Sequence, residues 1–129
     1  MTGPLEGVRV LDVGNFISGP FAAMLLADMG AEVVKVENPK GGDPFRAWDL
    51  GGDKPSFWAY NRGKKSVTLN LQMPEGREMF HQLCRKADVV LENFRPGVMK
   101  KLGIDYESLR PLNERLIYCS VTGMGATGP

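Results

Sequence analysis

Short apolar runs alternate with helix-like segments along the chain, and this alternation predicts an α/β fold. Nearly continuous, β-branched runs are typical of strands that are buried on both faces of a parallel sheet. In residues 66–71, apolar and polar side chains instead alternate, which is typical of a half-buried strand. The predicted strands are 8–13, 33–36, 66–71, 88–91 and 116–121. The predicted helices are 20–29, 74–86, 98–102 and 106–112. Together they indicate one domain, 1–129, built on a Rossmann-like, doubly wound parallel sheet of about five strands.

This periodic pattern disappears between Asp43 and Lys65, where glycine, proline, aromatic and charged residues are mixed. The segment is longer than a simple connection, so we interpret it as a functional excursion rather than a linker. Its aromatic content argues against disorder. The aromatic residues are Phe45, Trp48, Phe57, Trp58 and Tyr60.

Composition excludes several classes of protein. The 129 residues include 16 Lys and Arg against 15 Asp and Glu, which gives no compositional case for binding nucleic acid. No stretch approaches the roughly 18 apolar residues that a membrane span needs, and the first residues, MTGPLEG, lack the features of a signal peptide. We therefore expect a cytoplasmic protein with neither a nucleic-acid nor a membrane partner.

Cysteine and histidine offer no obvious chemistry. Cys84 and Cys119 stand singly in apolar runs and are interpreted as small hydrophobic residues, so no metal site is predicted. Met24 and Met29 are interpreted as core residues, and Met79 is placed on the inner face of the predicted helix 74–86. His81 lies within a predicted helix on its polar side and is expected to be solvated, which leaves no Ser-His-Asp triad.

The loops that follow the strands are the expected ligand site, because open α/β sheets bind ligands beyond the carboxyl ends of their strands. Several of these loops contain glycine or open a helix, which favours a phosphate-bearing ligand. Arg95 follows Asn93 and Phe94 at the end of one strand, so an amide, an aromatic face and a cation come in succession. The candidate cations are Arg62, Lys64, Lys65, Arg95, Lys100 and Lys101.

A nicotinamide dinucleotide is one alternative ligand. Gly14 and Gly19 follow the first strand, and Glu37 ends the second, where a carboxylate for ribose is expected. The segment GNFISG lacks the G-x-G-x-x-G spacing, and Phe16 would obstruct the approach of a pyrophosphate. The glycines can equally well serve only the turn from strand to helix. An NAD-dependent reductase therefore stays an alternative.

Five segments in collinear order resemble the N-terminal part of the class III CoA-transferases, a family that includes formyl-CoA and carnitine CoA-transferases and 2-methylacyl-CoA racemases. They are LEGVRVLDV, FISGPFAAMLLADMGAEVVKVENPKGGDPFR, FWAYNRGKKSVTLNL, ADVVLENFRPGVMKKLGIDYESL and RLIYCSVTGMGATGP. The resemblance implies transfer of CoA from an acyl-CoA to a carboxylic acid through an aspartyl-CoA thioester. The family's aspartate is expected beyond Pro129, so the chain is expected to be an inactive N-terminal portion of a longer enzyme, incomplete relative to the family.

The resemblance also implies which residues contact coenzyme A or an acyl-CoA. Asn38 departs from the family pattern, in which arginine is common at that position. Lys101 matches a position that is usually basic and suits a CoA phosphate. The implied contacts are Ile17, Ser18, Asn38, Leu69, Asn70, Leu71, Gln72, Asn93, Phe94, Arg95 and Lys101.

Two further alternatives and one partner follow from the resemblance. The family contains acyl-CoA racemases, but the full-length segment between Asp43 and Lys65 favours a transferase. A short chain could also serve only as a non-catalytic CoA-binding module. The whole family members form an interlocked homodimer, which implies the same assembly for the full-length protein.

Overall fold

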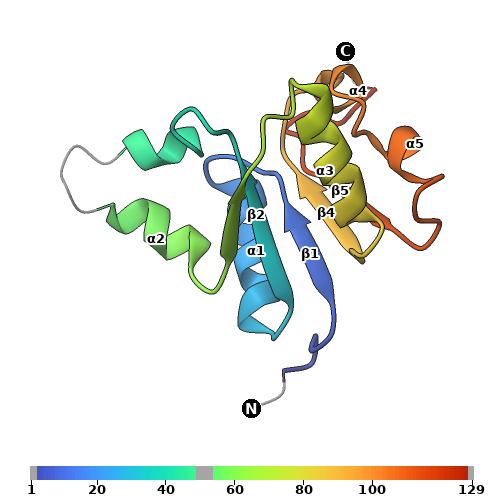
Figure 1. The fold of residues 1–129 in the computed structure, drawn as a ribbon. Coiled ribbons are helices and arrows are strands. Elements are labelled where there is room, and N and C mark those ends of the chain that lie inside the picture. Colours follow the sequence, from blue (N-terminus) through green and yellow to red (C-terminus); the bar gives the residue numbers. More distant parts are fainter. Residues whose placement is uncertain (1–2, 49–53, 128–129) are drawn as a thin grey trace.

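The computed structural model describes residues 3–48 and 54–127. Five parallel strands form one sheet in the order β3-β2-β1-β4-β5, which confirms the predicted α/β fold (Figure 1). The strands are β1 (Arg9–Asp12), β2 (Glu32–Glu37), β3 (Lys65–Thr68), β4 (Val89–Glu92) and β5 (Ile117–Ser120). The third strand is shorter than predicted, because the chain leaves the sheet after Thr68. Leu69 and Leu71 still pack against the core beyond the end of the strand.

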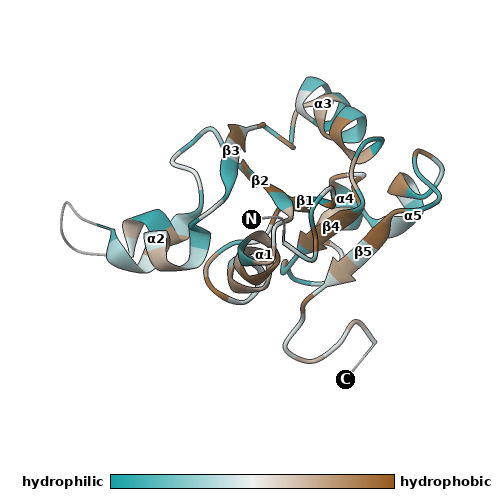
Figure 2. Cartoon of the chain, turned by 90° about the horizontal axis from the view of Figure 1, so that it is seen from below, coloured by the Kyte–Doolittle hydropathy of each residue, from teal (hydrophilic) through white to brown (hydrophobic). Residues whose placement is uncertain are grey.

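Helices cover both faces of the sheet. Seen along the sheet, α1 and α3 lie on opposite sides of it (Figure 2). The helical segments are α1 (Ser18–Asp28), the 3₁₀ turn η1 (Pro44–Ala47), α2 (Pro55–Asn61), α3 (Pro74–Cys84), α4 (Val98–Lys101) and α5 (Tyr106–Leu109). Among the described residues, no helix is long and apolar enough to cross a bilayer.

Each face of the sheet has its own hydrophobic core. Side chains alternate along a strand, so Val10 of β1 points toward α1 while Leu11 points toward α3. The core beneath α3 is the larger one, and Phe80 and Cys84 of that helix are fully buried in it. The core beneath α1 is smaller, and it contains Ala23 of that helix.

The segment between Asp43 and Lys65 contains two short helical elements, η1 and α2, that the sequence pattern did not predict. Asp43 accepts a hydrogen bond from the backbone N–H of Phe45 (2.9 Å) and thereby caps η1. Pro55 occupies the first turn of α2, where a missing N–H costs nothing. Proline and an Asx cap were readable signals, but the short elements carry no hydrophobic period. Residues 49–53 of this segment lie outside the described residues.

Two methionines differ from the expected burial. Met24 is buried in the core as expected, but Met29 is 40% exposed at the end of α1. Met79, which the helical pattern placed on the inner face of α3, is 52% exposed. Phe80 next to it fills the core instead, because neighbouring residues on a helix point about 100° apart.

Candidate functional site

The strand order reverses between β1 and β4, so the loops that follow these two strands diverge and open a crevice. Asn93, at the end of β4, ties the two loops together. Its Oδ1 accepts a hydrogen bond from the backbone N–H of Asn15 (2.8 Å), and its Nδ2 donates to the carbonyl of Asn15 (2.8 Å) and to Ser18 Oγ (2.9 Å). Asn93 therefore acts as a brace within the site, a role that no pattern in the sequence indicated.

The glycines of the first loop serve close packing. A Cβ at Gly14 would lie 3.1 Å from Gly19 Cα and 3.1 Å from Asn93 Oδ1, and one at Gly19 would meet the same amide. These contacts explain both glycines as parts of a strand-to-helix turn that approaches Asn93. Close packing alone therefore accounts for both glycines, and their presence is not evidence for a dinucleotide ligand.

Four buried charges lie under the first loop. Lys35 Nζ lies 2.9 Å from Asp43 Oδ2 and 3.7 Å from Asp12 Oδ2, and it donates a hydrogen bond to the carbonyl of Gly14 (2.8 Å). Lys64 Nζ lies 2.8 Å from Asp12 Oδ2. Burial lowers the pKa of Lys64, and the carboxylate of Asp12 opposes that shift. This cluster was not predicted from the sequence, although a lysine inside the apolar strand VVKV was a usable signal.

Phe16 is held above this cluster in a left-handed conformation (φ 60°). Its backbone N–H donates to Asp43 Oδ1 (3.0 Å), so the same carboxylate that pairs with Lys35 fixes the loop. Its ring packs against Phe45 and Trp48, with ring centroids 6.1 and 6.4 Å apart. The buried charges therefore set the backbone of the loop that enters α1.

Glu37, the residue expected to bind a ribose, instead forms hydrogen bonds within the protein itself. Arg46 binds its carboxylate through two hydrogen bonds of 2.8 Å, and Ser66 Oγ and the backbone N–H of Asp43 donate to it as well. Burial raises the pKa of Glu37, but these donors outweigh that effect and lower the pKa to about 2. The carboxylate is thus ionised, and both of its oxygens already accept hydrogen bonds from the protein. This argues against a nicotinamide dinucleotide whose ribose would bind at this strand end.

Two clefts flank Phe94 at the carboxyl edge of the sheet. The first has a volume of about 730 Å³ and runs from Ser18 and Asn93 past Arg95 to residues 121–126. The second has a volume of about 320 Å³ and is lined by apolar side chains and by several amides. The amide-bearing residues of the second cleft are Asn15, Asn38, Asn70 and Gln72. Phe94 lines both clefts and forms the wall between them.

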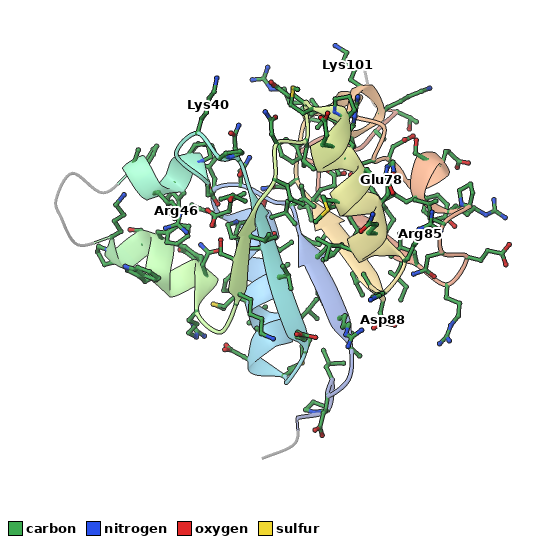
Figure 3. The ribbon with its side chains drawn as sticks, viewed as in Figure 1. Lys40, Arg46, Glu78, Arg85, Asp88 and Lys101 are labelled. Atoms are coloured by element: carbon green, nitrogen blue, oxygen red, sulfur yellow. The ribbon has the colours of Figure 1, made fainter. Side chains whose placement is uncertain are left out.

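Nine of the eleven residues implied as coenzyme contacts line these two clefts. The exceptions are Ile17 and Lys101. Ile17 lines a separate hollow of about 240 Å³ among the aromatic rings of Phe16, Phe45, Trp48 and Tyr60. Lys101 is exposed on α4 and points away from the sheet at its carboxyl end (Figure 3).

Three of the six candidate cations are already paired within the protein. Lys64 is buried against Asp12, Arg62 pairs with Asp28 (2.6 Å), and Lys65 pairs with Glu32 (2.6 Å). The last two pairs lie at the amino edge of the sheet, away from the clefts, because Lys65 begins β3 and Asp28 ends α1. Arg95, Lys100 and Lys101 form no ion pair among the described residues.

The remaining polar candidates lie away from the clefts. His81 is not simply solvated as expected, because it is partly buried and its Nε2 lies 3.1 Å from the carbonyl oxygen of Gly103. Cys84 is buried, and this burial raises the pKa of its thiol to about 12. Cys119, by contrast, is exposed on the edge strand β5.

The chain is similar to known proteins in both sequence and structure. The family model for CoA-transferase family III matches residues 5–129. Succinate–glutarate CoA-transferase of Agrobacterium fabrum is 50% identical over 98% of this chain, which covers 34% of that protein. The β subunit of succinyl-CoA–L-malate CoA-transferase of Chloroflexus aurantiacus is 47% identical over 99% of this chain, covering 32% of that protein.

A solved structure gives the same result in three dimensions. The crystal structure of a CAIB/BAIF family protein from Brucella suis superposes with a TM-score of 0.92 and 45% identity over 100% of this chain, which covers 36% of that structure. The chain thus spans about a third of the length of the proteins that it matches. Since the family model covers nearly every residue, this chain belongs to CoA-transferase family III.

Proposed function

We propose that this chain supplies the coenzyme A site of a CoA-transferase that moves CoA from an acyl-CoA to a carboxylic acid. The observation that carries the proposal is the pair of clefts on either side of Phe94. They gather, from the four segments that follow β1, β2, β3 and β4, nine of the eleven residues that the family resemblance implies. Their volumes fall in the range of about 300–1,000 Å³ that is usual for small-molecule sites.

The nucleotide end of the coenzyme fits the second cleft. Adenine is an apolar plane with polar edges, and this cleft combines apolar walls from Val36, Leu69 and Phe94 with the amides of Asn70 and Gln72. Amides can both donate to and accept from the edge of a base. The Phe94 ring offers a face on which the base can stack.

The pantetheine arm would then pass Phe94 into the first cleft. This cleft is larger and reaches Ser18 at the start of α1. Arg95 lines it and is the cation of this cleft, where it can pair with a phosphate of the coenzyme. The thioester carbon, at the far end of the arm, would lie beside the first loop that the buried charges hold in place.

The reaction itself would need a carboxylate nucleophile. In the proposed route an aspartate attacks the thioester carbonyl and expels CoA as a thiolate, which gives a mixed anhydride. The CoA thiolate then attacks the aspartyl carbonyl and releases the first acid, and the second acid reverses these steps. Glu37 is saturated by Arg46, so it is not a candidate for this role. As the family resemblance implies, we propose that the nucleophilic aspartate lies beyond Pro129 and that the 129 residues alone do not transfer CoA.

The names of the relatives support a substrate class and a partner. Both relatives described above are named for the transfer of CoA between dicarboxylic acids, so we propose a dicarboxylate as one of the two acids. One of them is a β subunit, so the partner chain of the active enzyme is either a second copy, as in an interlocked homodimer, or a related chain.

Calorimetric titration of the 129-residue chain with CoA and with NADH tests the proposed ligand. We expect CoA to bind and NADH not to bind. Arg95→Ala should weaken CoA binding about tenfold, since it removes a charge-assisted contact. The matched control is Arg85→Ala, because Arg85 lies at the opposite end of β4 from the clefts (Figure 3). Binding of NADH without binding of CoA would overturn the proposal in favour of a reductase.

A further inference from the structure

We propose that Lys40 is the phosphate-binding cation of the second cleft and that Asn38 positions it. This inference rests on the proposed function, because it assigns a contact within the same coenzyme site. It differs from the expectation drawn from sequence, which named Asn38 as the binding residue of this loop and did not include Lys40.

Lys40 provides the only positive charge among the described residues that line the second cleft. The one acidic residue in the lining, Glu37, is neutralised by the two hydrogen bonds from Arg46. Lys40 forms no ion pair among the described residues. The rim of the cleft therefore carries a net positive charge that no carboxylate within 3–48 or 54–127 balances.

The turn after β2 explains why Asn38 is not the binding group. Its side-chain Oδ1 accepts a hydrogen bond from the backbone N–H of Lys40 (2.8 Å), and its carbonyl accepts one from Gly42 (2.9 Å). Gly41 and Gly42 then turn the chain with φ of +87° and +73°. The amide oxygen of Asn38 is thus used within the turn, as is common for asparagine at this position of a loop. Asn70 is used in the same way, since its Oδ1 accepts from the backbone N–H of Gln72 (3.1 Å), so Asn70 offers a base only its amide NH₂ group.

The same turn places the Lys40 side chain. Lys40 is exposed and extends from the loop at the carboxyl end of the sheet, away from the core (Figure 3). A base in the second cleft would leave its ribose and phosphates at this rim, within reach of a long, flexible ammonium side chain. Lysine acts toward phosphate as a mobile point charge, which suits a group at an open rim.

The ligand class is a phosphate group on the nucleotide end of coenzyme A. Two phosphates could meet Lys40, the 3′-phosphate of the ribose and the diphosphate that leads to the pantetheine arm. Titrating each protein with both CoA and 3′-dephospho-CoA separates them, because only the first carries the 3′-phosphate.

The experiment measures the dissociation constants of both ligands for the 129-residue chain and for Lys40→Gln by calorimetry. We expect Lys40→Gln to weaken CoA binding about three- to tenfold, as for one exposed charge-assisted contact. Lys40→Arg should keep most of the affinity. Lys86→Gln is the matched control, since it removes the same charge from a hollow at the amino edge of the sheet, and it should bind CoA as the unaltered chain does.

Each outcome decides the proposal. A loss with CoA that disappears with 3′-dephospho-CoA assigns Lys40 to the 3′-phosphate, and a loss with both ligands assigns it to the diphosphate. Equal affinities of Lys40→Gln and the unaltered chain for CoA overturn the inference while leaving the proposed function intact. An equal loss in Lys86→Gln also overturns it, because the effect would then reflect overall charge. If the unaltered chain does not bind CoA, both proposals fail.

Asn38 gives an independent check of the positioning role. Asn38→Asp keeps an oxygen that can accept from Lys40 N–H, whereas Asn38→Ala removes it. We expect Asn38→Ala to weaken CoA binding in the unaltered chain but to add no further loss in Lys40→Gln, since Asn38 acts through Lys40. Independent, additive losses from the two substitutions would contradict this coupling.

Discussion

Lys35 and Asp43 form a buried ion pair, with 2.9 Å between Nζ and Oδ2 and both side chains at most 2% exposed. The pair joins β2 to the segment that follows it, and the second oxygen of Asp43 holds the backbone N–H of Phe16. Lys35 also donates to the carbonyl of Gly14. One ion pair therefore fixes two positions of the loop that leads into α1.

Removing Lys35 should destabilise the protein strongly. Lys35→Met leaves the carboxylate of Asp43 buried without its counter-charge, which costs about 3–5 kcal/mol in comparable pairs. Lys65→Gln is the control, because the Lys65–Glu32 pair is largely exposed (72% and 41%) and such pairs contribute less than about 1 kcal/mol. Urea unfolding of both variants measures the difference. Equal losses would show that burial of the first pair has no energetic consequence.

Stability should depend on the ionisation of Glu37. Although burial raises its pKa, hydrogen bonds from Arg46 and Ser66 lower it from 4.5 to about 2. The folded state thus prefers the charged form, so the stabilisation is complete above about pH 4.5 and is lost as the pH falls toward 2. Glu37→Gln should remove this contribution.

The unfolding free energies of the unaltered chain and of Glu37→Gln, measured in urea across this range of pH, test that prediction. Their difference should shrink steadily as the pH falls from 4.5 to 2. Arg46→Met should show a similarly weakened pH dependence, because it removes the largest source of the lowered pKa. A difference that stays constant with pH would mean that Glu37 ionises equally in the folded and unfolded states.

Asn93 and Arg95 should differ in what they contribute. Asn93→Ala removes three hydrogen bonds that join the loops after β1 and β4, and it should lower the unfolding free energy by about 1–3 kcal/mol. Arg95→Ala removes an exposed side chain and should change stability by less than about 0.5 kcal/mol while weakening CoA binding. Thermal unfolding together with CoA titration distinguishes the two roles. A stable Asn93→Ala protein would contradict the bracing role.

Gly76 should resist substitution although it lies in a helix. A Cβ at this position would come 2.6 Å from the carbonyl carbon of Asn70, so alanine would push the 69–72 segment that lines the second cleft. Gly76→Ala should therefore cost about 1–3 kcal/mol and weaken CoA binding, where helix propensity alone would favour alanine by about 1 kcal/mol. Gly123→Ala, with nothing within 4 Å, should be neutral. A stabilised Gly76→Ala protein would exclude the close contact.

The fold was predictable because each strand carries its own signal. A run such as 33–36 (VVKV) is apolar at every position except Lys35, and proline or glycine marks the start or end of the helices beside it. The helices between Asp43 and Lys65 were missed because each spans only one or two turns, which is too short for a hydrophobic period. Their ends are set by local hydrogen bonds and by packing of Tyr60 against Phe21.

The candidate site was predictable only in part, for a similar reason. Loops after parallel strands can be recognised from sequence order, so Asn93, Phe94 and Arg95 were placed correctly at the carboxyl edge. Which charges are available to a ligand depends on contacts between distant segments. Lys64 was predicted as a cation for the ligand, but it forms an ion pair with Asp12, 52 residues away along the chain.

The most direct test of the central claim is to map where CoA binds. Amide chemical shifts of the 129-residue chain, recorded by NMR during a titration with CoA, report contacts along the whole backbone. We expect shifts in the loops at the carboxyl edge, at 14–18, 38–42, 69–72 and 93–97, and none around Arg9, Glu32 and Asp88 at the amino edge. Shifts confined to the amino edge, or no shifts at millimolar CoA, would contradict the account.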